Sequence, residues 1–341
     1  MKKKKWLWLV LTVFIVMLTL VCFRYGKILS SNTAFDEKTK VVFIRDTMAF
    51  ETWVNNPDNN GVFKNPQLLL RTAELKNLKT LNPGRYLIQK GMNSNAIVNM
   101  LRIAGQTPLK IRTDNVKTLE ELAGKLGKNF RNDSVAFISA FTDKETCAKY
   151  GVNPITIACM LMPNTYEFYW TITPAEYLKK MNGIYLNYWT DDNQKKAKDL
   201  NLSKTDVSIL ASIVKAETGK TVEAPKIAGL YLNRLRINMP LQSDPTATFG
   251  NAVKNAQRVY FGDFMNDSPY NTYRNAGLPP GPINFPEKVY LDAVLNAEKH
   301  SYVYMCAQPG GTGLHNFAKT LDQHNVYSSQ YHKWLNQRGI R

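Results

Sequence analysis

A single glutamate, Glu217, is the residue that this sequence places best for acid–base chemistry. The segment that begins at Ser203, with Asp206 three residues later, predicts the capped start of a helix. Apolar residues recur along it at helical spacing, and Glu217 takes the next position of that apolar stripe. Burial there, and the negative end of the helix dipole as the helix stops at Gly219, would both raise the pKa of its carboxyl group. A carboxylic acid that stays protonated near neutral pH is what a glycosidic general acid needs.

The competing interpretation of Glu217 is structural, because a glutamate near a helix end can also reach solvent or pair with a basic side chain. Three loops favour the chemical interpretation: residues 241–248, 270–283 and 313–317. Proline and glycine stiffen these loops, and they are rich in amide, hydroxyl and aromatic side chains. Hydroxyl-rich ligands need such fixed donors, acceptors and ring faces. The loops and Glu217 together predict an active site that acts on a carbohydrate.

Several side chains are candidates for supporting roles around Glu217. Asp244 precedes Pro245, so we expect it to shape its loop or orient substrate rather than act as a nucleophile. Asn233 and Arg234 lie on a helix predicted to begin at Pro225, where we expect them to support the site from behind. Arg234 could there pair with a buried carboxylate. Six loop side chains are candidates for direct contacts with a sugar or an attached peptide: Gln242, Asp244, Thr246, Asn271, Tyr273 and His315.

The sequence predicts no cofactor and no metal site. The four histidines form no H-x-x-x-H pair and have no cysteine ligand pattern near them. The cysteines beyond the N-terminal apolar run are Cys147, Cys159 and Cys306, and an odd number excludes a fully paired disulfide framework. A bridge between the first two and packed free thiols both stay open.

The N-terminus has the pattern of a membrane anchor. A basic cluster, Lys2 to Lys5, precedes an uncharged run from Trp6 to Phe23, and Arg24 and Lys27 follow. The pattern predicts a tail at residues 1–5 and one transmembrane helix at 6–23. No small-residue cleavage pattern follows, so we expect this helix to stay attached rather than be removed as a signal peptide. The tail would be cytoplasmic, and the rest would lie outside the inner (cytoplasmic) membrane, in the periplasmic space.

The chain carries a net charge of +17. Beyond residue 27 it still holds 38 basic against 27 acidic residues. Nearness to a membrane and to an acidic wall polymer explains this excess better than nucleic acid does, because no zinc-finger or RNA-recognition signature is present. We therefore expect the cytoplasmic membrane as a partner and no nucleic acid.

The fold class expected beyond the anchor is α+β, in two parts. A polar stalk at 28–39 would lead into a small α+β module at 40–113, and a larger mixed α/β domain would occupy 114–341. Its elements would include a long helix over 174–200, a helix from Pro286, and a terminal helix capped by Thr320, whereas 241–250 is too rich in turn residues for an element. The strands and helices expected in the module are Lys40–Arg45, Pro66–Asn77, Gly84–Ile88, Asn93–Ile103 and Leu109–Thr113.

Long motifs in the chain match a known family. They read LASIVKAET at 210–218, AGLYLNRLRINMPLQSDPTATFG at 228–250, YNTYRNAGLPPGPI at 270–283 and GTGLHNF at 311–317. With these motifs, and with GRYLI near residue 84, the chain resembles the endolytic murein transglycosylase, or YceG-like, family. It departs from the family pattern at Asn164, where the family usually has an aspartate.

The resemblance implies a lyase that cuts the glycan strands of peptidoglycan internally, between N-acetylmuramic acid and N-acetylglucosamine. The 6-hydroxyl of the muramic sugar would attack its own C1 and leave a 1,6-anhydro end. The resemblance places the family's catalytic glutamate at Glu217 and a LysM-like module at 40–113. It also implies a role in ending nascent strands, with peptidoglycan synthases as possible partners.

Two other functions stay open. A hydrolytic muramidase would cut the same bond with water, and such hydrolases normally use two carboxylates. In that case Asp244 would be the second carboxylate. A non-catalytic scaffold that binds peptidoglycan at the membrane is the third candidate, and it requires Glu217 to be dispensable.

Overall fold

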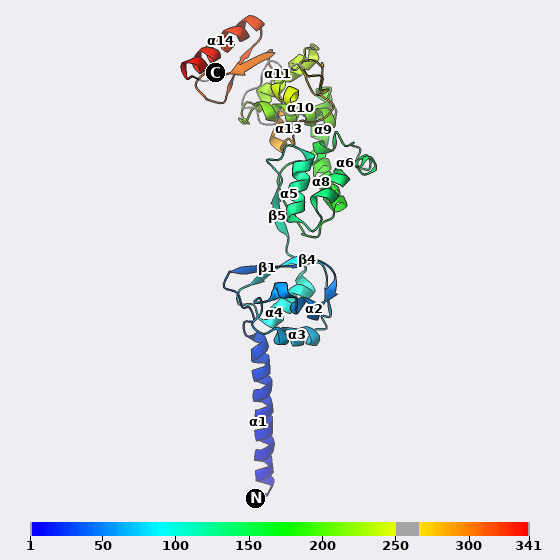
Figure 1. The fold of residues 1–341 in the computed structure, drawn as a ribbon, viewed down its shortest axis with the longest axis vertical. Coiled ribbons are helices and arrows are strands. Elements are labelled where there is room, and N and C mark those ends of the chain that lie inside the picture. Colours follow the sequence, from blue (N-terminus) through cyan, green and yellow to red (C-terminus); the bar gives the residue numbers. More distant parts are fainter. Residues whose placement is uncertain (1, 250–265, 340–341) are drawn as a thin grey trace. The chain divides into compact units, whose positions relative to one another are not determined.

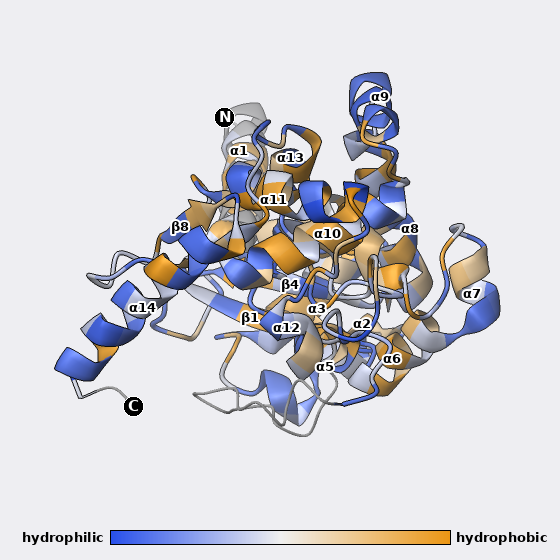
Figure 2. Ribbon diagram, turned by 90° about the horizontal axis from the view of Figure 1, so that it is seen from above, coloured by the Kyte–Doolittle hydropathy of each residue, from blue (hydrophilic) through white to orange (hydrophobic). Residues whose placement is uncertain are grey.

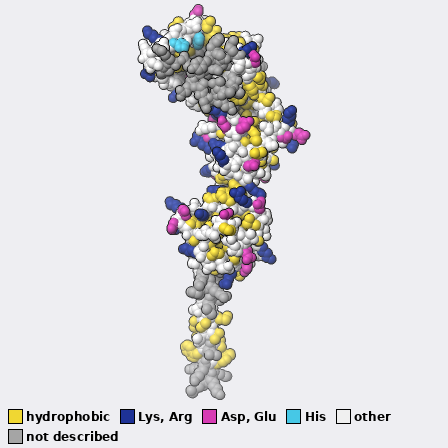
Figure 3. Space-filling view, viewed as in Figure 1, with side chains coloured by type: hydrophobic (Ala, Val, Ile, Leu, Met, Phe, Trp, Pro, Cys, Tyr) yellow, Lys and Arg dark blue, Asp and Glu magenta, His cyan; other side chains and the backbone are white. Residues whose placement is uncertain are grey.

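The computed structural model describes residues 2–249 and 266–339, and the chain divides into two compact units (Figure 1). The first unit comprises residues 2–110 together with Glu167–Ile172. The second comprises residues 111–166 and 173–339. Basic side chains are spread over the visible face of each unit (Figure 3).

The first unit begins with helix α1, Lys2–Leu29, which includes the run expected to be a membrane anchor. Among the residues described, no helix reaches the combination of length and apolar character that spanning a bilayer demands. The segment after α1 is not the separate stalk expected from its polar composition, since Asn32, Thr33 and Phe35 are buried. Asn32 donates hydrogen bonds to the Asn65 carbonyl and the Ser94 hydroxyl, and this pairing attaches the segment to the unit.

The rest of the first unit is a small α+β structure, as the sequence predicts. Its strands are β1 (Thr39–Ile44), β2 (Met48–Ala49), β3 (Thr80–Leu81) and β4 (Gly84–Gln89). They pair antiparallel as β1 with β4 and β2 with β3. The unit also has three α-helices: α2 (Phe50–Val54), α3 (Pro66–Leu75) and α4 (Ser94–Asn99), the last continued by a π-helical turn at Met100–Ala104. Helix α3 packs against both α2 and α4. The fully buried side chains of this core include Ile44, Leu69, Ile88 and Ile97.

The second unit begins with short helices, and one strand pair has residues in both units. The helices are α5 (Leu119–Asn129), α6 (Ser134–Thr142) and α7 (Lys144–Ala148), and strand β5 (Leu109–Arg112) pairs with β6 (Thr165–Phe168). The single helix expected over 174–200 is two helices, α8 (Pro174–Tyr188) and the hydrophilic α9 (Asp191–Asp199) (Figure 2). The break has a local cause, because Trp189 is buried in non-helical backbone and Thr190 caps α9.

Helix α10, Lys204–Glu217, is the core of the second unit. Its predicted capping box is present: Ser203 accepts from the backbone N–H of Asp206, whose carboxylate accepts from the N–H of Ser203. The helix is capped at Thr218, whose backbone is extended (φ −142°), one residue before the stop at Gly219 that the sequence predicted. Helices α11 (Ala224–Arg236) and α13 (Lys288–Leu295) pack against α10.

The remaining elements of the second unit surround the end of α10. A short helix, α12 (Asp244–Thr248), forms where no element was expected, because Pro245 is well suited to the first helical turn. Gly250, the last residue of that expected turn-rich stretch, lies outside the described residues. Strands β7 (Tyr304–Ala307) and β8 (His315–Ala318) form an antiparallel hairpin, and the terminal helix α14 (Leu321–Gln337) packs on it.

Candidate active site

A cavity of about 390 Å³ lies at the end of α10. Its volume is in the range of small-molecule binding sites. Helices α10, α11, α12 and α14, strands β7 and β8 and the intervening loops contribute to it, so residues from more than 100 positions apart meet there. The lining residues are Glu217, Leu230, Tyr231, Arg234, Gln242, Asp244, Tyr273, Tyr304, Met305, Cys306, Ala307, His315, Leu321 and His324.

Glu217 is held in this cavity by two neutral hydroxyl groups. Its Oε1 accepts hydrogen bonds from Tyr231 Oη at 2.8 Å and from Ser243 Oγ at 2.5 Å. Burial is the largest influence on the Glu217 carboxyl and raises its pKa above the ordinary value of 4.5. The two hydroxyls favour the charged form and lower the pKa, but burial outweighs them. The group is therefore an acid that keeps its proton to higher pH than an exposed glutamate.

A set of buried polar contacts fixes the loop that presents Ser243. The backbone N–H of Ser243 donates to Thr272 Oγ1 at 3.0 Å, and the Thr246 hydroxyl lies 2.7 Å from the same oxygen. Thr246 and Asn271 have no exposed surface, and Asn271 accepts from the backbone N–H of Tyr273 at 3.1 Å. These two predicted sugar contacts thus hold the loops in place, and their side chains do not line the cavity.

Asp244 and Tyr273 both line the cavity and contact each other. Tyr273 Oη donates to Asp244 Oδ1 at 2.5 Å, so the carboxylate is oriented from the opposite loop. Burial, and then the bond to Asp244, raise the pKa of Tyr273, which keeps the phenol a neutral donor. Gln242 precedes them with a left-handed backbone (φ +49°) and also lines the cavity.

His315 reaches the cavity through a partner that sequence reasoning missed. The carboxylate of Glu223, just before α11, accepts from the backbone N–H of His315 at 2.9 Å, and its other oxygen lies 3.0 Å from His315 Nδ1. Both side chains are mostly buried, at 16% and 12% exposure. The pair fixes the orientation of the imidazole ring at the edge of the cavity.

Asn233 and Arg234 fasten α11 to neighbouring backbone. Arg234 donates from Nε to the Val303 carbonyl and from Nη1 to the Leu241 carbonyl, each at 2.6 Å. Asn233 donates from Nδ2 to two carbonyls, those of His300 at 2.8 Å and Tyr302 at 3.0 Å. Asn233 does not line the cavity, whereas Arg234, which was expected to lie behind the site, lines it. The expected pairing of Arg234 with a buried carboxylate is not found among the described residues, because a helical stripe indicates the face of a residue but not its partner.

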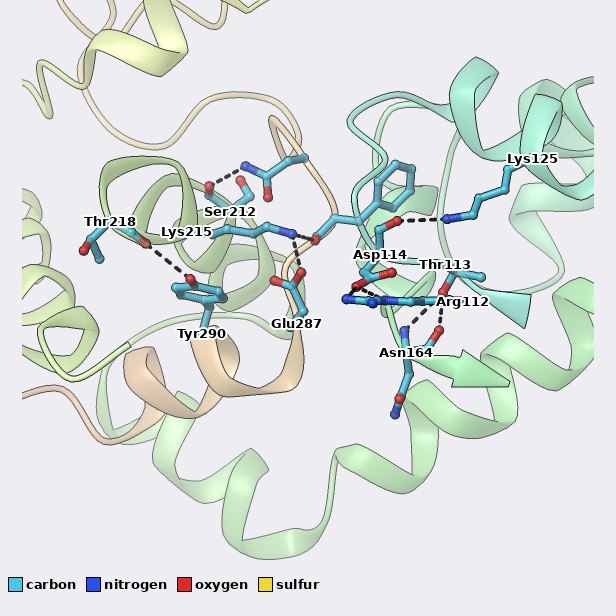
Figure 4. A network of polar contacts seen from close by, with 12 residues as sticks. Arg112, Thr113, Asp114, Lys125, Asn164, Ser212, Lys215, Thr218, Glu287 and Tyr290 are labelled. Carbon is cyan, nitrogen blue, oxygen red and sulfur yellow. Dashed lines mark hydrogen bonds and ion pairs between the residues drawn. The ribbon is translucent and has the colours of Figure 1, made fainter. Parts of the chain in front are cut away.

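The opposite side of α10 carries a separate polar network (Figure 4). Lys215 donates to Glu287 Oε1 at 2.6 Å and to the Phe285 carbonyl at 2.8 Å. Tyr290 Oη donates to the carbonyl of Thr218, the residue that ends the helix, at 3.2 Å. These contacts secure the helix end from behind, so that Glu217 keeps its position in the cavity.

Figure 4 also shows where the departure from the family motif lies. Thr113 Oγ1 donates to the Asn164 carbonyl at 3.0 Å and accepts from the Asn164 N–H at 3.1 Å. Asn164 is not among the cavity-lining residues. Its side chain accepts from the backbone N–H of Thr165 at 2.7 Å, a local contact that shapes the turn into β6.

Cys147, Cys159 and Cys306 are free thiols, and Cys306 lines the cavity. Across residues 2–249 and 266–339, no group of three or more histidine, cysteine or acidic side chains is arranged to hold a metal ion.

Four further residues at the site were not found from the sequence: Tyr231, Ser243, Tyr304 and His324. Tyr231 offers the one usable signal, because its hydroxyl lies on the apolar stripe of a helix, where a polar group needs a partner. The other three are brought to Glu217 or to its cavity by tertiary folding alone.

Residues 42–330 match the model of the YceG-like family. An endolytic murein transglycosylase of Bacillus subtilis is 29% identical over 91% of this chain and 89% of its own length. One of Streptococcus pneumoniae is 26% identical over 86% of this chain, which spans only 60% of that protein.

A solved structure shows the same fold. A yceG-like protein of Listeria monocytogenes superposes with a TM-score of 0.57 at 24% identity, over 85% of this chain and 99% of that one. The family match extends from strand β1 into α14 and includes Glu217 and the other cavity-lining residues. The chain therefore belongs to the YceG-like family.

Proposed function

We propose that this chain is an endolytic murein transglycosylase, a lyase that cuts peptidoglycan glycan strands internally. The observation that carries the proposal is the state of Glu217, a buried carboxyl of raised pKa that faces a cavity and is held by two hydroxyls. The relatives named above bear this activity in their names. A single acid of this kind suits a reaction in which one group first gives and then takes a proton.

The proposed reaction has two proton transfers. Glu217 donates its proton to the glycosidic oxygen, and the C1–O bond breaks with its electron pair going to that oxygen. The 6-hydroxyl of the muramic sugar then bonds to C1, and its proton returns to the Glu217 carboxylate. Tyr231 and Ser243 stabilise the intermediate carboxylate because both donate to the same oxygen.

The substrate contacts are assigned from the lining of the cavity. Gln242, Asp244, Tyr273 and His315 are proposed to bind the sugars on either side of the cleaved bond. Asp244 is oriented by Tyr273 and placed beside Ser243, so its negative charge would favour the positive charge that develops at C1. Thr246 and Asn271 would act indirectly, through the loops that they hold.

The test is product analysis by mass spectrometry. The full wild-type chain and a Glu217→Gln variant are each incubated with uncrosslinked murein strands. The glutamine keeps an oxygen that can accept from the hydroxyls of Tyr231 and Ser243. Wild type should release internal fragments with 1,6-anhydro ends, and the variant should be slower by at least about 10³-fold, within the range of acid–base catalysis. A folded variant that cuts at the wild-type rate would exclude this function.

The hydrolytic muramidase is the second candidate, favoured by the presence of Asp244 as another carboxylate in the cavity. The same products decide between the two reactions. Hydrated reducing ends would identify a hydrolase and make Asp244 the second catalytic group. If the wild-type chain binds the glycan strands but does not cut them, the chain is a non-catalytic scaffold.

Location, partners and module type are also proposals. The support for an inner-membrane anchor is the sequence pattern of Lys2 to Lys5 followed by the uncharged run at 6–23. The LysM-like assignment of the first unit and a partnership with peptidoglycan synthases rest on the family resemblance. Fractionation of cells tests the anchor: extraction of the chain from membranes by salt alone, without detergent, would contradict it.

A further inference from the structure

The cavity has a second wall that the proposed reaction leaves unused. We define the β7–α14 wall as Tyr304, Met305, Cys306, Leu321 and His324, which line the cavity together with Glu217. The side of the cavity around Glu217 is polar, with Gln242 and Asp244. The β7–α14 wall is aromatic and apolar instead, so its chemistry differs from that of the side around Glu217.

Two members of the β7–α14 wall, Tyr304 and His324, are held by ring contacts. The imidazole of His324 stacks on the ring of Tyr304, with centroids 5.5 Å apart and planes at 29°. The guanidinium of Arg234 lies 5.6 Å from the centre of the same ring. Arg234 is itself fixed by short bonds to backbone carbonyls, so the ring of Tyr304 is supported from the core of the unit. A preorganised surface of this kind binds a ligand at low entropic cost.

His324 adds one hydrogen-bonding group to this apolar surface. Within the described part of the chain, neither ring nitrogen has a hydrogen-bond partner. Nδ1 is buried, so Nε2 is the nitrogen that a ligand in the cavity can reach. Burial first, and then the nearby charge of Arg234, lower the pKa of His324, so the ring is neutral at neutral pH. A neutral imidazole offers one donor and one acceptor. The wall therefore combines an aromatic face, apolar side chains and an uncharged polar group without a protein partner.

Methyl-bearing amides have the matching chemistry. The methyl packs against apolar and aromatic side chains, and the uncharged amide exchanges a hydrogen bond with a neutral ring. A murein strand carries such groups in two places: the 2-acetamido group of each sugar, and the amide that joins the lactyl group to the first alanine of the stem peptide.

We propose that the β7–α14 wall is a recognition site for a methyl-bearing amide of the murein strand, with His324 as its hydrogen-bonding residue. The proposal rests on the function proposed above, because it assigns the substrate group bound beside Glu217. His324 would then be a specificity residue. The amide that it contacts lies away from the cleaved bond, so the contact would affect substrate binding rather than proton transfer.

Binding rather than turnover provides the test, so that chemistry does not confuse the result. The parent is the full chain carrying Glu217→Gln, and His324→Ala is added to it. His332→Ala is the matched control, because this exposed histidine lies on the same helix and does not line the cavity. Calorimetry measures Kd for three murein tetrasaccharides: one with stem peptides, one without them, and one with peptides but without N-acetyl groups.

For the fragment that carries both stem peptides and N-acetyl groups, His324→Ala should raise Kd about tenfold, which corresponds to about 1.4 kcal/mol of binding free energy. The control should match the parent. If His324→Ala does not raise Kd for the fragment without peptides, the wall binds the stem-peptide amide. If it does not raise Kd for the fragment without N-acetyl groups, the wall binds the acetamido group.

Two results would overturn the proposal: the same Kd for His324→Ala and parent on the substituted fragment, or an equal loss on all three fragments. Failure of the proposed reaction is visible separately. Wild type would then leave strands uncut while the parent still bound them, and the binding comparison would still decide the role of the wall.

Discussion

Two glutamates near the end of α10 have opposite surroundings. Glu287 lies behind the helix, where its Oε1 accepts from the ammonium of Lys215 at 2.6 Å (Figure 4). Glu217 lies in front, where Tyr231 and Ser243 are its hydrogen-bond donors. Lys215 and Glu217 are two residues apart, so the helix turns them about 200° from each other. The ammonium of Lys215 is thus paired with Glu287, and the direct hydrogen-bond donors of Glu217 are neutral hydroxyls.

This difference explains why the same residue type can hold a helix in one place and do chemistry in another. Glu287 is tied to the ammonium of Lys215 in an ion pair, and that contact holds the end of the helix. A buried carboxyl that meets only hydroxyls keeps its proton longer, yet its conjugate base is still stabilised once the proton is gone. Glu217 has the second environment, which suits a group that must give and take a proton in one turnover.

Among these variants, removal of Ser243 Oγ should have the largest effect, because it changes the hydrogen bonding of Glu217 directly. In Ser243→Ala, the Glu217 carboxylate loses one of its two donors, which favour the charged form. We expect kcat to fall by roughly 10- to 100-fold, in line with about 1.5–3 kcal/mol for a hydrogen bond to a charged group. The pKa of Glu217 should rise, so the basic limb of the pH–rate profile should move to higher pH. An unchanged limb with a lower rate would assign Ser243 a purely structural role.

Asp244→Asn tests whether the negative charge of Asp244, which lines the cavity with Glu217, contributes to catalysis. Asparagine keeps an oxygen that can accept from Tyr273 but removes the charge. We expect kcat to fall by about tenfold, at the low end of the effects of lost electrostatic stabilisation. KM should change little, and 1,6-anhydro ends should persist. Abolished activity with unchanged folding would instead point to a nucleophile or base, as in the muramidase.

Lys215→Met tests the pair behind the helix. Glu287 would keep a partly buried carboxylate, 31% exposed, without its cation. We expect a loss of about 1–2 kcal/mol in unfolding free energy, between the values for exposed and buried pairs, and little change in kcat at temperatures where the variant is folded. Denaturant unfolding measures the loss, and adding Glu287→Gln should restore part of it. A large fall in kcat without a loss of stability would contradict the separation of the two sides.

The smallest expected effect is a pH dependence of stability. The pKa of Glu217 in the folded chain lies above its ordinary value of 4.5. The folded state therefore holds this proton more tightly than the unfolded state does, and stability falls as the pH rises from 4.5 through the folded pKa. Each unit of the rise corresponds to about 1.4 kcal/mol.

Glu217→Gln removes this titration. The variant should gain melting temperature relative to wild type as the pH increases from 4 toward neutrality, and the gain should level off above the folded pKa. Thermal unfolding of both chains at several pH values measures it. If the difference in melting temperature between the variant and wild type does not change with pH, the pKa of Glu217 is not raised in solution.

The sequence predicted much of the local structure around Glu217. The capping box at Ser203 and Asp206 and the apolar stripe of α10 are local patterns, so the helix and the face of its last residue could be read directly. The break at Trp189 and Thr190 was missed because a buried aromatic cluster and a cap interrupt residues that are otherwise good helix formers. Helix α12 was missed because a five-residue helix has too few residues for a periodic pattern.

The site itself was predicted only in part. Loop composition identified Gln242, Asp244, Tyr273 and His315, which line the cavity, but also Thr246 and Asn271, which are buried beneath it. Composition indicates that a loop can bind polar groups, but it does not say which side chains point outward. That depends on the backbone path.

By itself, the sequence determined the helix that carries Glu217, the face on which it lies and the family motifs around it, since all of these depend on residues close together in the chain. Tertiary structure alone decided the chemistry of that glutamate. Its donor Ser243 is 26 residues away, and the cation on Lys215 is taken up by a residue 72 positions away. A pKa depends on which groups meet in space and on how well water is excluded, and neither is a property of local sequence.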